Sequence, residues 1–254
     1  MKFEEKLKKV FTDYVFENYI MECPEIALKY YHSLRVARVC RDLASEVGLN
    51  ERKAYAVGLL HDIARFRQFT DYATFQDLNS FDHGQRAVDM LFEEGLIKPF
   101  DIPKNWYPAV YFSIKNHNKK EIDFDEIEKQ CGVCSSEIIS YSKLIRDADK
   151  IDIIFQLCSM PKLTNGSGSG YNKKCLKELL DKQSVTIKSD RSVLDVVFAQ
   201  MGLLFNIYYK ESFDKIDLDK FFESRIKFTQ NKLNEKDMKI LETTIGKVRF
   251  LLEG

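Results

Sequence analysis

The chain has 254 residues, and 44% of them are hydrophobic, which is enough to close one sizeable core or at most two small domains. Its 39 lysine and arginine residues equal its 39 aspartate and glutamate residues, so no net charge draws the chain to nucleic acid or to an anionic membrane. Only 11 glycines and 5 prolines are present, which favours long helices over many short strands.

No segment of the sequence is apolar enough to be a membrane span. The longest uncharged run, residues 196–209, is shorter than the ~20 apolar residues that cross a bilayer. The N-terminus lacks the apolar core of a signal peptide, so we expect a cytoplasmic protein without a membrane partner, and its six cysteines are expected to stay reduced. Cys131 and Cys134 have CxxC spacing, but no second CxxC completes a four-thiolate zinc site, and the sequence leaves their role open.

Hydrophobic residues recur at three- and four-residue steps over most of the chain, the period of helices that bury one face. Prolines at first turns, glycines after last turns and capping side chains set the predicted boundaries. In the first part of the chain the predicted helices span residues 3–20, 24–47, 51–64, 82–94, 108–117 and 135–158. Helical periodicity returns over residues 193–209 and 217–253.

Three segments depart from this pattern. Residues 65–82 mix aromatic and polar side chains in a predicted loop that is too long for a simple connection, and loops of this length are often functional. Residues 164–171 (TNGSGSGY) are rich in glycine and serine, which predicts a flexible surface loop. Residues 183–188 (QSVTIK) are compatible with one short strand, and we see no internal repeat and no clear linker.

The chain contains four histidines, all in its first half: His32, His61, His83 and His117. His32 lies one helical turn from Leu28 and from Val36, so its imidazole points into the core. A single histidine on such a face is most often a hydrogen-bonded core residue, and the case for another role depends on the acidic residues that accompany it.

Asp149 is the strongest acidic candidate. It lies one turn from Ile145 and from Ile153, which places a carboxylate on the buried face of the longest predicted helix. An unpaired buried carboxylate costs several kcal/mol, so Asp149 is expected to be paired or bound to a cation. Asp147, by contrast, has lysines four residues before it and three after it, a pattern typical of an exposed ion pair.

His61 and Asp62 are adjacent and lie among Leu59, Leu60 and Ile63, so an imidazole and a carboxylate enter the interior side by side. This donor pair suits a divalent transition metal, and a carboxylate can bridge two ions with its two oxygens.

The order His32, His61-Asp62, Asp149 on predicted inward faces resembles the H…HD…D signature of the HD-domain superfamily of metal-dependent phosphohydrolases. The resemblance covers about residues 28–155 and includes the segment RDADKID; HDIARFRQF and TFQDLNSFDH resemble a bacterial subgroup of mostly uncharacterised members. It implies an all-α HD-domain helical bundle with a helical C-terminal extension. We therefore predict one domain over residues 1–254, with an HD metal-binding core over 24–158 and a mainly helical extension over 159–254 that covers the core.

The resemblance also implies a site with one or two divalent ions of Mn, Mg, Co, Ni, Fe or Zn. The first ion is expected at His32, His61, Asp62 and Asp149, while His83 and His117 hold a second ion or contact phosphate. Metal-bound water becomes acidic, and Asp62 is expected to take its proton. The alternative for His83 is a helix-start residue beside Asp82, and for His117 a cation that stabilises a helix C-terminus.

The expected substrate is a nucleotide or another small phosphate ester, which Arg65, Lys115 and Lys150 are candidates to contact, although each of them also fits a solvated face. Aromatic side chains of residues 65–82 either stack on a base or anchor the segment to the core. Cyclic dinucleotide phosphodiesterases of the HD type carry a second histidine where this chain has Asn118, which argues against that narrower identity.

Two other functions fit the same residues. Some HD-fold proteins with six histidine and aspartate ligands are di-iron oxygenases, and others bind nucleotides without catalysis. The sequence leaves the substrate, the choice between phosphomonoesterase and phosphodiesterase, the metal and the oligomeric state open.

Overall fold

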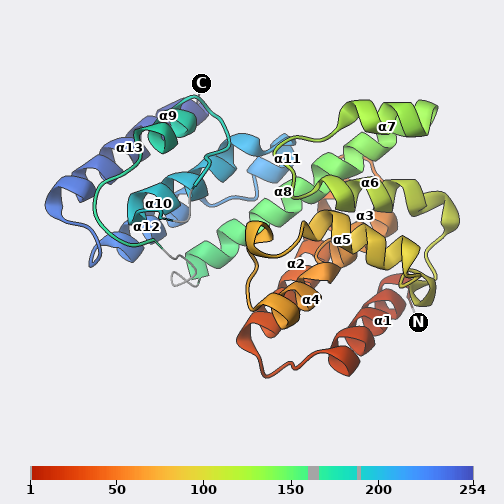
Figure 1. The fold of residues 1–254 in the computed structure, drawn as a ribbon. Coiled ribbons are helices and arrows are strands. Elements are labelled where there is room, and N and C mark those ends of the chain that lie inside the picture. Colours follow the sequence, from red (N-terminus) through yellow and green to blue (C-terminus); the bar gives the residue numbers. More distant parts are fainter. Residues whose placement is uncertain (1, 160–165, 188–189, 254) are drawn as a thin grey trace. The chain divides into compact units, whose positions relative to one another are not determined.

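The computed structural model describes residues 2–159, 166–187 and 190–253. These residues form helices joined by turns and loops, and no strand occurs among them, so the predicted all-α fold is confirmed (Figure 1). The chain divides into two compact units, Met1–Asp152 and Ile153–Gly254, and the division falls within one continuous helix. The expectation of a single domain with a core over 24–158 stays a prediction.

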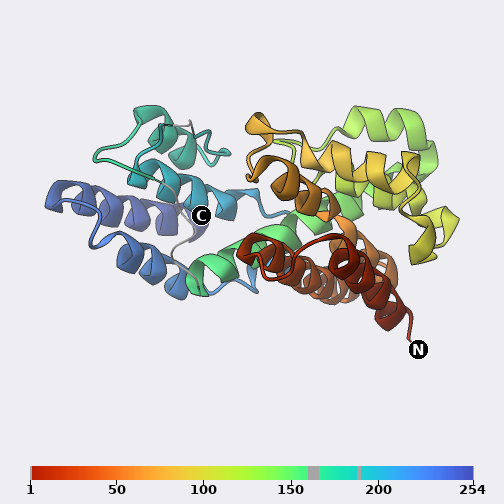
Figure 2. The same cartoon turned by 60° about the horizontal axis from the view of Figure 1, so that its bottom comes forward.

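The first unit contains seven helices and most of an eighth within its described residues. These are α1 (Phe3–Asn18), α2 (Pro24–Glu46), α3 (Glu51–Leu60), α4 (Ile63–Tyr72), α5 (His83–Val88), α6 (Tyr107–Asn116), α7 (Phe124–Cys131) and α8 (Ser135–Ser159). Single turns accompany them: η1 (Asp77–Asn79), η2 (Asp89–Glu93), η3 (Lys98–Phe100), η4 (Lys104–Trp106) and η5 (Gly132–Cys134). Figures 1 and 2 show α1, in red, at the outer edge of this unit.

The central packing contact of the first unit joins α2 to α3. It depends on Gly58, where a Cβ atom would meet the Cα atom of Ala37 at 2.8 Å and the Sγ atom of Cys40 at 2.9 Å. Cys40, Val36 and the surrounding aliphatic side chains are fully buried, so the two helices approach closely along this line. This contact brings His32 of α2 close to His61, the residue that follows α3.

The helix predicted over 51–64 is interrupted at His61-Asp62. His61 Nδ1 donates to the carbonyl oxygen of Gly58 at 2.8 Å, and Asp62 leaves the helical conformation with φ −106° and ψ 19°. A new helix, α4, then continues to Tyr72, so the segment predicted as a loop from residue 65 begins at Ala73, which has a φ of 51°. Because apolar residues keep a helical period across the break, periodicity alone does not reveal it.

Two other predictions in this unit needed correction. The helix predicted over 82–94 is capped by Asp82, whose side chain accepts from the backbone of Gln85, but after Val88 it widens into the π turn η2. The segment between residues 117 and 135, for which we predicted no helix, contains α7, capped by Asp123.

Helix α8 is the longest described helix, and from Tyr141 to Asp152 nearly all of its residues are buried. Asp147 is 0% exposed, so the expectation that it forms an exposed ion pair is wrong. Lysines at helical spacing indicate a solvated face only when the helix has one, and nearly all residues of this part of α8 are buried.

The second unit is built from the end of α8 and from α9 (Lys173–Leu180), α10 (Val193–Gly202), α11 (Lys210–Phe213), α12 (Leu218–Thr229) and α13 (Glu235–Glu253), with the turn η6 (Leu203–Asn206). These helices enclose an apolar core that includes Leu194, Phe198 and Phe221. The helix predicted over 193–209 ends at Gly202, and the one predicted over 217–253 is two helices.

Of the segment predicted as a short strand, residues 183–187 form none, and Lys188 lies outside the described residues. Of the predicted loop 164–171, residues 166–171 are irregular as expected, and the first two positions lie outside the described residues. Among the helices that the structure describes, none combines the length and the apolar character that crossing a membrane requires.

Candidate metal centre

The structure gathers six predicted residues of the first unit into one buried cluster. His32 comes from α2, and His61 and Asp62 from the break between α3 and α4. His83 begins α5, His117 directly follows α6, and Asp149 lies in α8. His32 Nε2 lies 3.1 Å from Asp149 Oδ1 and 3.3 Å from His61 Nε2. The four imidazoles are at most 6% exposed, so residues separated by more than a hundred positions share a site from which water is largely excluded.

Asp62 lies at the middle of the cluster, and its two oxygens face different neighbours. Oδ2 is 3.5 Å from Nε2 of His32 and 3.5 Å from Nε2 of His61. Oδ1 is 3.6 Å from Nε2 of His83 and 3.5 Å from Nε2 of His117. One carboxylate therefore links two halves of the site, the arrangement in which a carboxylate can bridge two cations.

The four histidines present the same ring nitrogen, Nε2, to the cluster, because each Nδ1 has an acceptor elsewhere. Nδ1 of His61 and of His117 point at the carbonyl oxygens of Gly58 and Ile114, at 2.8 and 2.6 Å. Nδ1 of His32 and of His83 lie 2.6 Å from carboxylate oxygens, which belong to Asp152 and Asp77. Metal-binding histidines usually donate their second ring nitrogen in this way, which fixes the tautomer and the ring orientation.

The chemistry of this donor set fits a cation. A carbonyl oxygen only accepts, so a neutral His61 or His117 holds its proton on Nδ1 and presents a lone pair at Nε2. Burial lowers the pKa of His61 to about 3 and that of His83 to about 4, so both rings are neutral at pH 7. Lone pairs and carboxylate oxygens then face one another, and a divalent transition metal is the group that such donors bind.

The acids of the cluster are ionised. Burial by itself would raise the pKa of Asp149, but the hydrogen bond and the charge of His32 hold it well below the usual range. Burial would likewise lower the pKa of His32, yet hydrogen bonds to Asp149, Asp152 and Asp62 raise it to about 10. A cation bound between these groups would take over the role of the His32 proton.

Two sets of three ligand atoms lie close enough to share an ion, with all atoms of a set within 4.8 Å of one another. One set comes from His32, His61 and Asp149, and the other from His61, Asp62 and His117. The candidate ligands that we predicted from the sequence therefore meet in space, with His83 alongside His117 at an Nε2–Nε2 distance of 3.0 Å.

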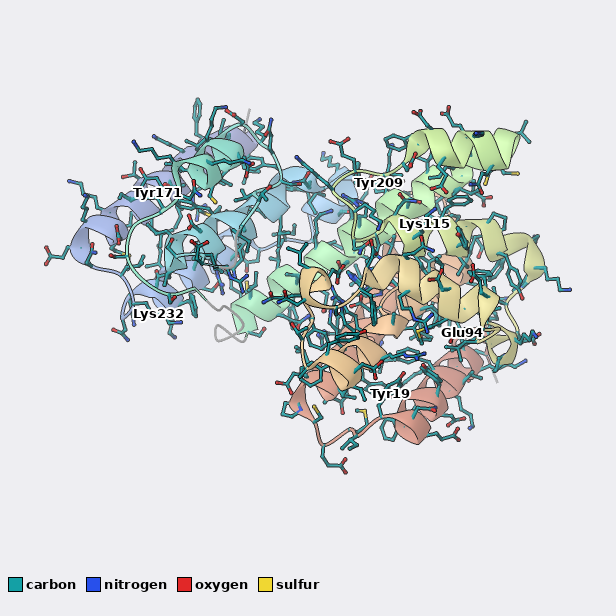
Figure 3. The ribbon with its side chains drawn as sticks, viewed as in Figure 1. Tyr19, Glu94, Lys115, Tyr171, Tyr209 and Lys232 are labelled. Atoms are coloured by element: carbon teal, nitrogen blue, oxygen red, sulfur yellow. The ribbon has the colours of Figure 1, made fainter. Side chains whose placement is uncertain are left out.

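The predicted substrate-contacting cations are distributed differently. Arg65 lies at the cluster, with Nε 3.5 Å from Asp62 Oδ1. Lys115, labelled on α6 in Figure 3, pairs with Glu126 of α7 at 2.5 Å, and the buried Lys150 donates to the carbonyl oxygen of Arg146. The substrate roles of Lys115 and Lys150 stay predictions.

Three residues that contact the cluster were not predicted from the sequence. Lys29 lies one helical turn before His32, and its Nζ atom is 2.7 Å from Asp62 Oδ2. Asp152 lies one turn after Asp149, so the spacing D-x-x-D on α8 marked it as a neighbour of the site. Asp77 carried no such signal, because it lies in the segment between two helices and its partner His83 is six residues away.

Most aromatic side chains of residues 65–82 anchor the segment. Phe66 is fully buried, and its ring lies 5.9 Å from that of Phe11. The ring of Tyr72 meets that of Phe81 at 5.7 Å. Phe75 differs from these, because its ring lies 5.4 Å from the Lys29 ammonium and 5.8 Å from the Arg65 guanidinium, which places it beside the cluster.

Comparison with protein families identifies the family of the part of the chain that holds this cluster. Residues 30–154 match the family model described as HD domain, so the chain belongs to the HD-domain superfamily, a superfamily of metal-dependent hydrolase type. The match begins two residues before His32 and ends two residues after Asp152, so it contains all six residues of the cluster, while Lys29 lies just outside it. No curated protein and no solved structure matches the chain.

Proposed function

We propose that the first unit is a metal-dependent phosphohydrolase that acts on a nucleotide or another small phosphate ester. The observation that carries this proposal is the convergence of four Nε2 atoms on the two oxygens of Asp62, with Asp149 completing the anionic side. A donor set rich in imidazole favours Mn²⁺, Fe²⁺, Co²⁺, Ni²⁺ or Zn²⁺ over Mg²⁺, which prefers oxygen ligands.

His32, His61, Asp62 and Asp149 would hold the first ion, and Asp62, His83 and His117 a second. When bound, such ions acidify water and offset the charge that develops on phosphoryl oxygens. Asp62 is the carboxylate placed to accept a proton from an attacking water, since it lies at the centre of the cluster. Lys29 and Arg65 add two positive charges within 3.5 Å of Asp62, which suits an anionic substrate.

The test is a hydrolysis screen on the metal-loaded protein. Nucleoside mono-, di- and triphosphates and cyclic nucleotides are incubated with Mn²⁺, Co²⁺, Ni²⁺ or Mg²⁺, and released phosphate or nucleoside is quantified. We expect turnover that the Asp62→Asn variant loses by at least 100-fold. Asp71→Asn is the matched control, because Asp71 is an exposed carboxylate on α4 that pairs with Arg67. Absence of hydrolysis with every metal and substrate would overturn the proposal.

The same screen separates the two other HD-type functions. A protein that retains two irons through purification and consumes oxygen with an organic substrate, without hydrolysis, would be a di-iron oxygenase. A protein that binds a nucleotide without turning it over would be a nucleotide sensor. The intact donor set favours catalysis over sensing, because a sensor has no need of ionised acids and neutral imidazoles around one carboxylate.

A further inference from the structure

The two halves of the metal centre differ in what holds their imidazoles in place. The acceptor for His32 is Asp152, which lies on α8, one turn beyond Asp149, and is itself held by Arg35 at 2.6 Å. The acceptor for His83 is Asp77, which lies in the short turn η1 between α4 and α5. One half is therefore fixed by a long buried helix, and the other by the connecting segment 73–82.

Two side chains of α4 fasten this segment. Arg65 Nη1 donates to the carbonyl oxygen of Phe75 at 2.6 Å and to Asp77 Oδ1 at 3.0 Å. Gln68, which is fully buried, donates from Nε2 to Asp77 Oδ1 at 3.0 Å and to the carbonyl oxygen of Phe81 at 3.1 Å. These bonds hold both the backbone of the segment and the carboxylate that faces His83.

Asn118 adds a contact from the far side. Its Nδ2 atom donates to Asp77 Oδ2 at 3.1 Å and to Asp82 Oδ1 at 2.9 Å. Asp77 thus accepts hydrogen bonds from an arginine, a glutamine, an asparagine and a histidine. These four donors fix the orientation of the Asp77 carboxylate, which would otherwise be free to rotate on the connecting turn.

We propose that Asp77 is a positioning residue for a second cation, and that segment 73–82 thereby determines whether the centre holds one ion or two. The inference rests on the metal centre of the proposed function. By accepting from Nδ1, Asp77 keeps the Nε2 lone pair of His83 directed at Asp62 Oδ1 and His117, which are the remaining ligands of that subsite. The described contacts of Asp77 are with His83, Arg65, Gln68 and Asn118, on the side of the second subsite, so its loss is expected to affect the first subsite little.

Metal stoichiometry tests whether Asp77 supports the second ion and not the first. Each protein is stripped with a chelator and dialysed against increasing Mn²⁺, bound metal is measured by mass spectrometry, and the spin-coupled Mn²⁺ pair is followed by electron paramagnetic resonance. We expect two ions in the unmodified protein. In Asp77→Asn the second dissociation constant should rise about 10- to 100-fold, as is typical when a residue that orients a metal ligand is lost, while the first changes less than about twofold.

Three further variants sharpen the test. Asp77→Glu keeps a carboxylate and should recover part of the second affinity, and Asp71→Asn should leave both ions in place. Gln68→Ala removes hydrogen bonds that hold segment 73–82 but keeps the Asp77 carboxylate, and it should weaken the binding of only the second ion. Circular dichroism and thermal melts show that each variant is folded at the temperature of the titration.

Three results of these titrations would contradict the role of Asp77. Binding of one ion by the unmodified protein, equal weakening of both ions in Asp77→Asn, or unchanged stoichiometry in that variant would overturn the inference. None of these results bears on whether the protein hydrolyses phosphate esters. Conversely, a protein that binds two Mn²⁺ ions in the predicted pattern but hydrolyses nothing would overturn the proposed function and leave the role of Asp77 standing.

Discussion

The Nε2 atoms of His83 and His117 lie 3.0 Å apart in the interior of the first unit. His117 donates through Nδ1 to the carbonyl oxygen of Ile114, so its Nε2 atom carries a lone pair when the ring is neutral. Burial keeps His83 neutral at pH 7 by lowering its pKa to about 4. Two facing nitrogens at this distance share either one proton or one cation.

Replacing either of these histidines should therefore remove one ion and spare the other. We expect His83→Ala and His117→Ala each to lose close to one metal equivalent, with turnover reduced by at least tenfold. The first subsite keeps all four of its residues, His32, His61, Asp62 and Asp149, so one ion should stay bound. Metal analysis of the purified variants checks this, and full occupancy with full activity in both would return the two histidines to structural roles.

Asp62 should behave differently from every other ligand, because its two oxygens serve both halves of the centre. Asp62→Asn is expected to lose both ions and all measurable turnover. The fold should persist, since the apolar contacts of α2, α3 and α6 do not involve this carboxylate. Metal content, activity and circular dichroism are the three measurements, and retention of a stoichiometric ion would contradict the bridging position.

Asp149 and Asp147 lie two residues apart on α8 and are expected to give different defects. Asp149 Oδ1 is 3.1 Å from His32 Nε2, so Asp149→Asn should weaken metal binding strongly, with a small change in stability. Asp147 is fully buried, and an amide there should cost about 1–3 kcal/mol of unfolding free energy. Urea unfolding and metal analysis of both variants separate the effects; metal loss in Asp147→Asn alone would place the site on the other face of α8.

Some of the ligands could be predicted from the sequence because they lie on inward faces, whereas His83 and His117 were expected only from the resemblance to the HD family. His32 lies on an apolar stripe of α2, and Asp149 repeats with isoleucines on α8, so helical phase alone directs both to the interior. The HD pair adds two donors of the type that metals need. These signals predicted the all-α fold, the HD superfamily and the residues that meet in the cluster.

The other features of the fold and the site could not be predicted, because they depend on tertiary contacts that do not alter the hydrophobic periodicity of the sequence. The interruption of the helix at His61 follows from a side-chain hydrogen bond to Gly58, and the apolar pattern continues across it. Asp147 has the pattern of a solvated residue but lies in a part of α8 where nearly all residues are buried. Asp77 meets His83 only because two residues of α4 hold the intervening segment.

Lys150 should make stability depend on pH at alkaline values. Burial and the nearby Arg146 lower its pKa from 10.5 to about 8 in the folded protein. Between pH 8 and 10.5 the unfolded chain therefore binds more protons, and stability rises with pH as the folded state loses the buried charge. The cost of that charge is fully present below pH 8 and is about 3 kcal/mol.

Lys150→Met removes this charge and keeps the length of the side chain. We expect the variant to be more stable than the unmodified protein at pH 7 and to show a smaller rise in stability between pH 8 and 10.5. Guanidinium unfolding across this range measures both effects. An equal rise in the two proteins would show that Lys150 is not the titrating group.

Gly58 sets the distance between α2 and α3. In Gly58→Ala the new Cβ atom would meet backbone and sulfur atoms of α2 at 2.8–3.0 Å, so the helices must separate, at a cost of about 1–3 kcal/mol. Gly246→Ala is the matched control, because a Cβ atom on that position of α13 meets nothing within 4 Å and should stabilise the helix by up to about 1 kcal/mol. Thermal melts compare the two, and equal effects would contradict the packing argument.

The hydrogen bond between His32 and Asp152 joins residues 120 positions apart. During synthesis the chain must extend past Asp152 before His32 can find its acceptor, whereas α2 and α3 can pair long before that. Contacts of such separation close late, because the entropy of ordering the intervening loop is lost before the contact is gained. Capture of metal is therefore expected to be a terminal event in folding, and a nascent chain truncated before residue 152 should bind it poorly even when its first helices have formed.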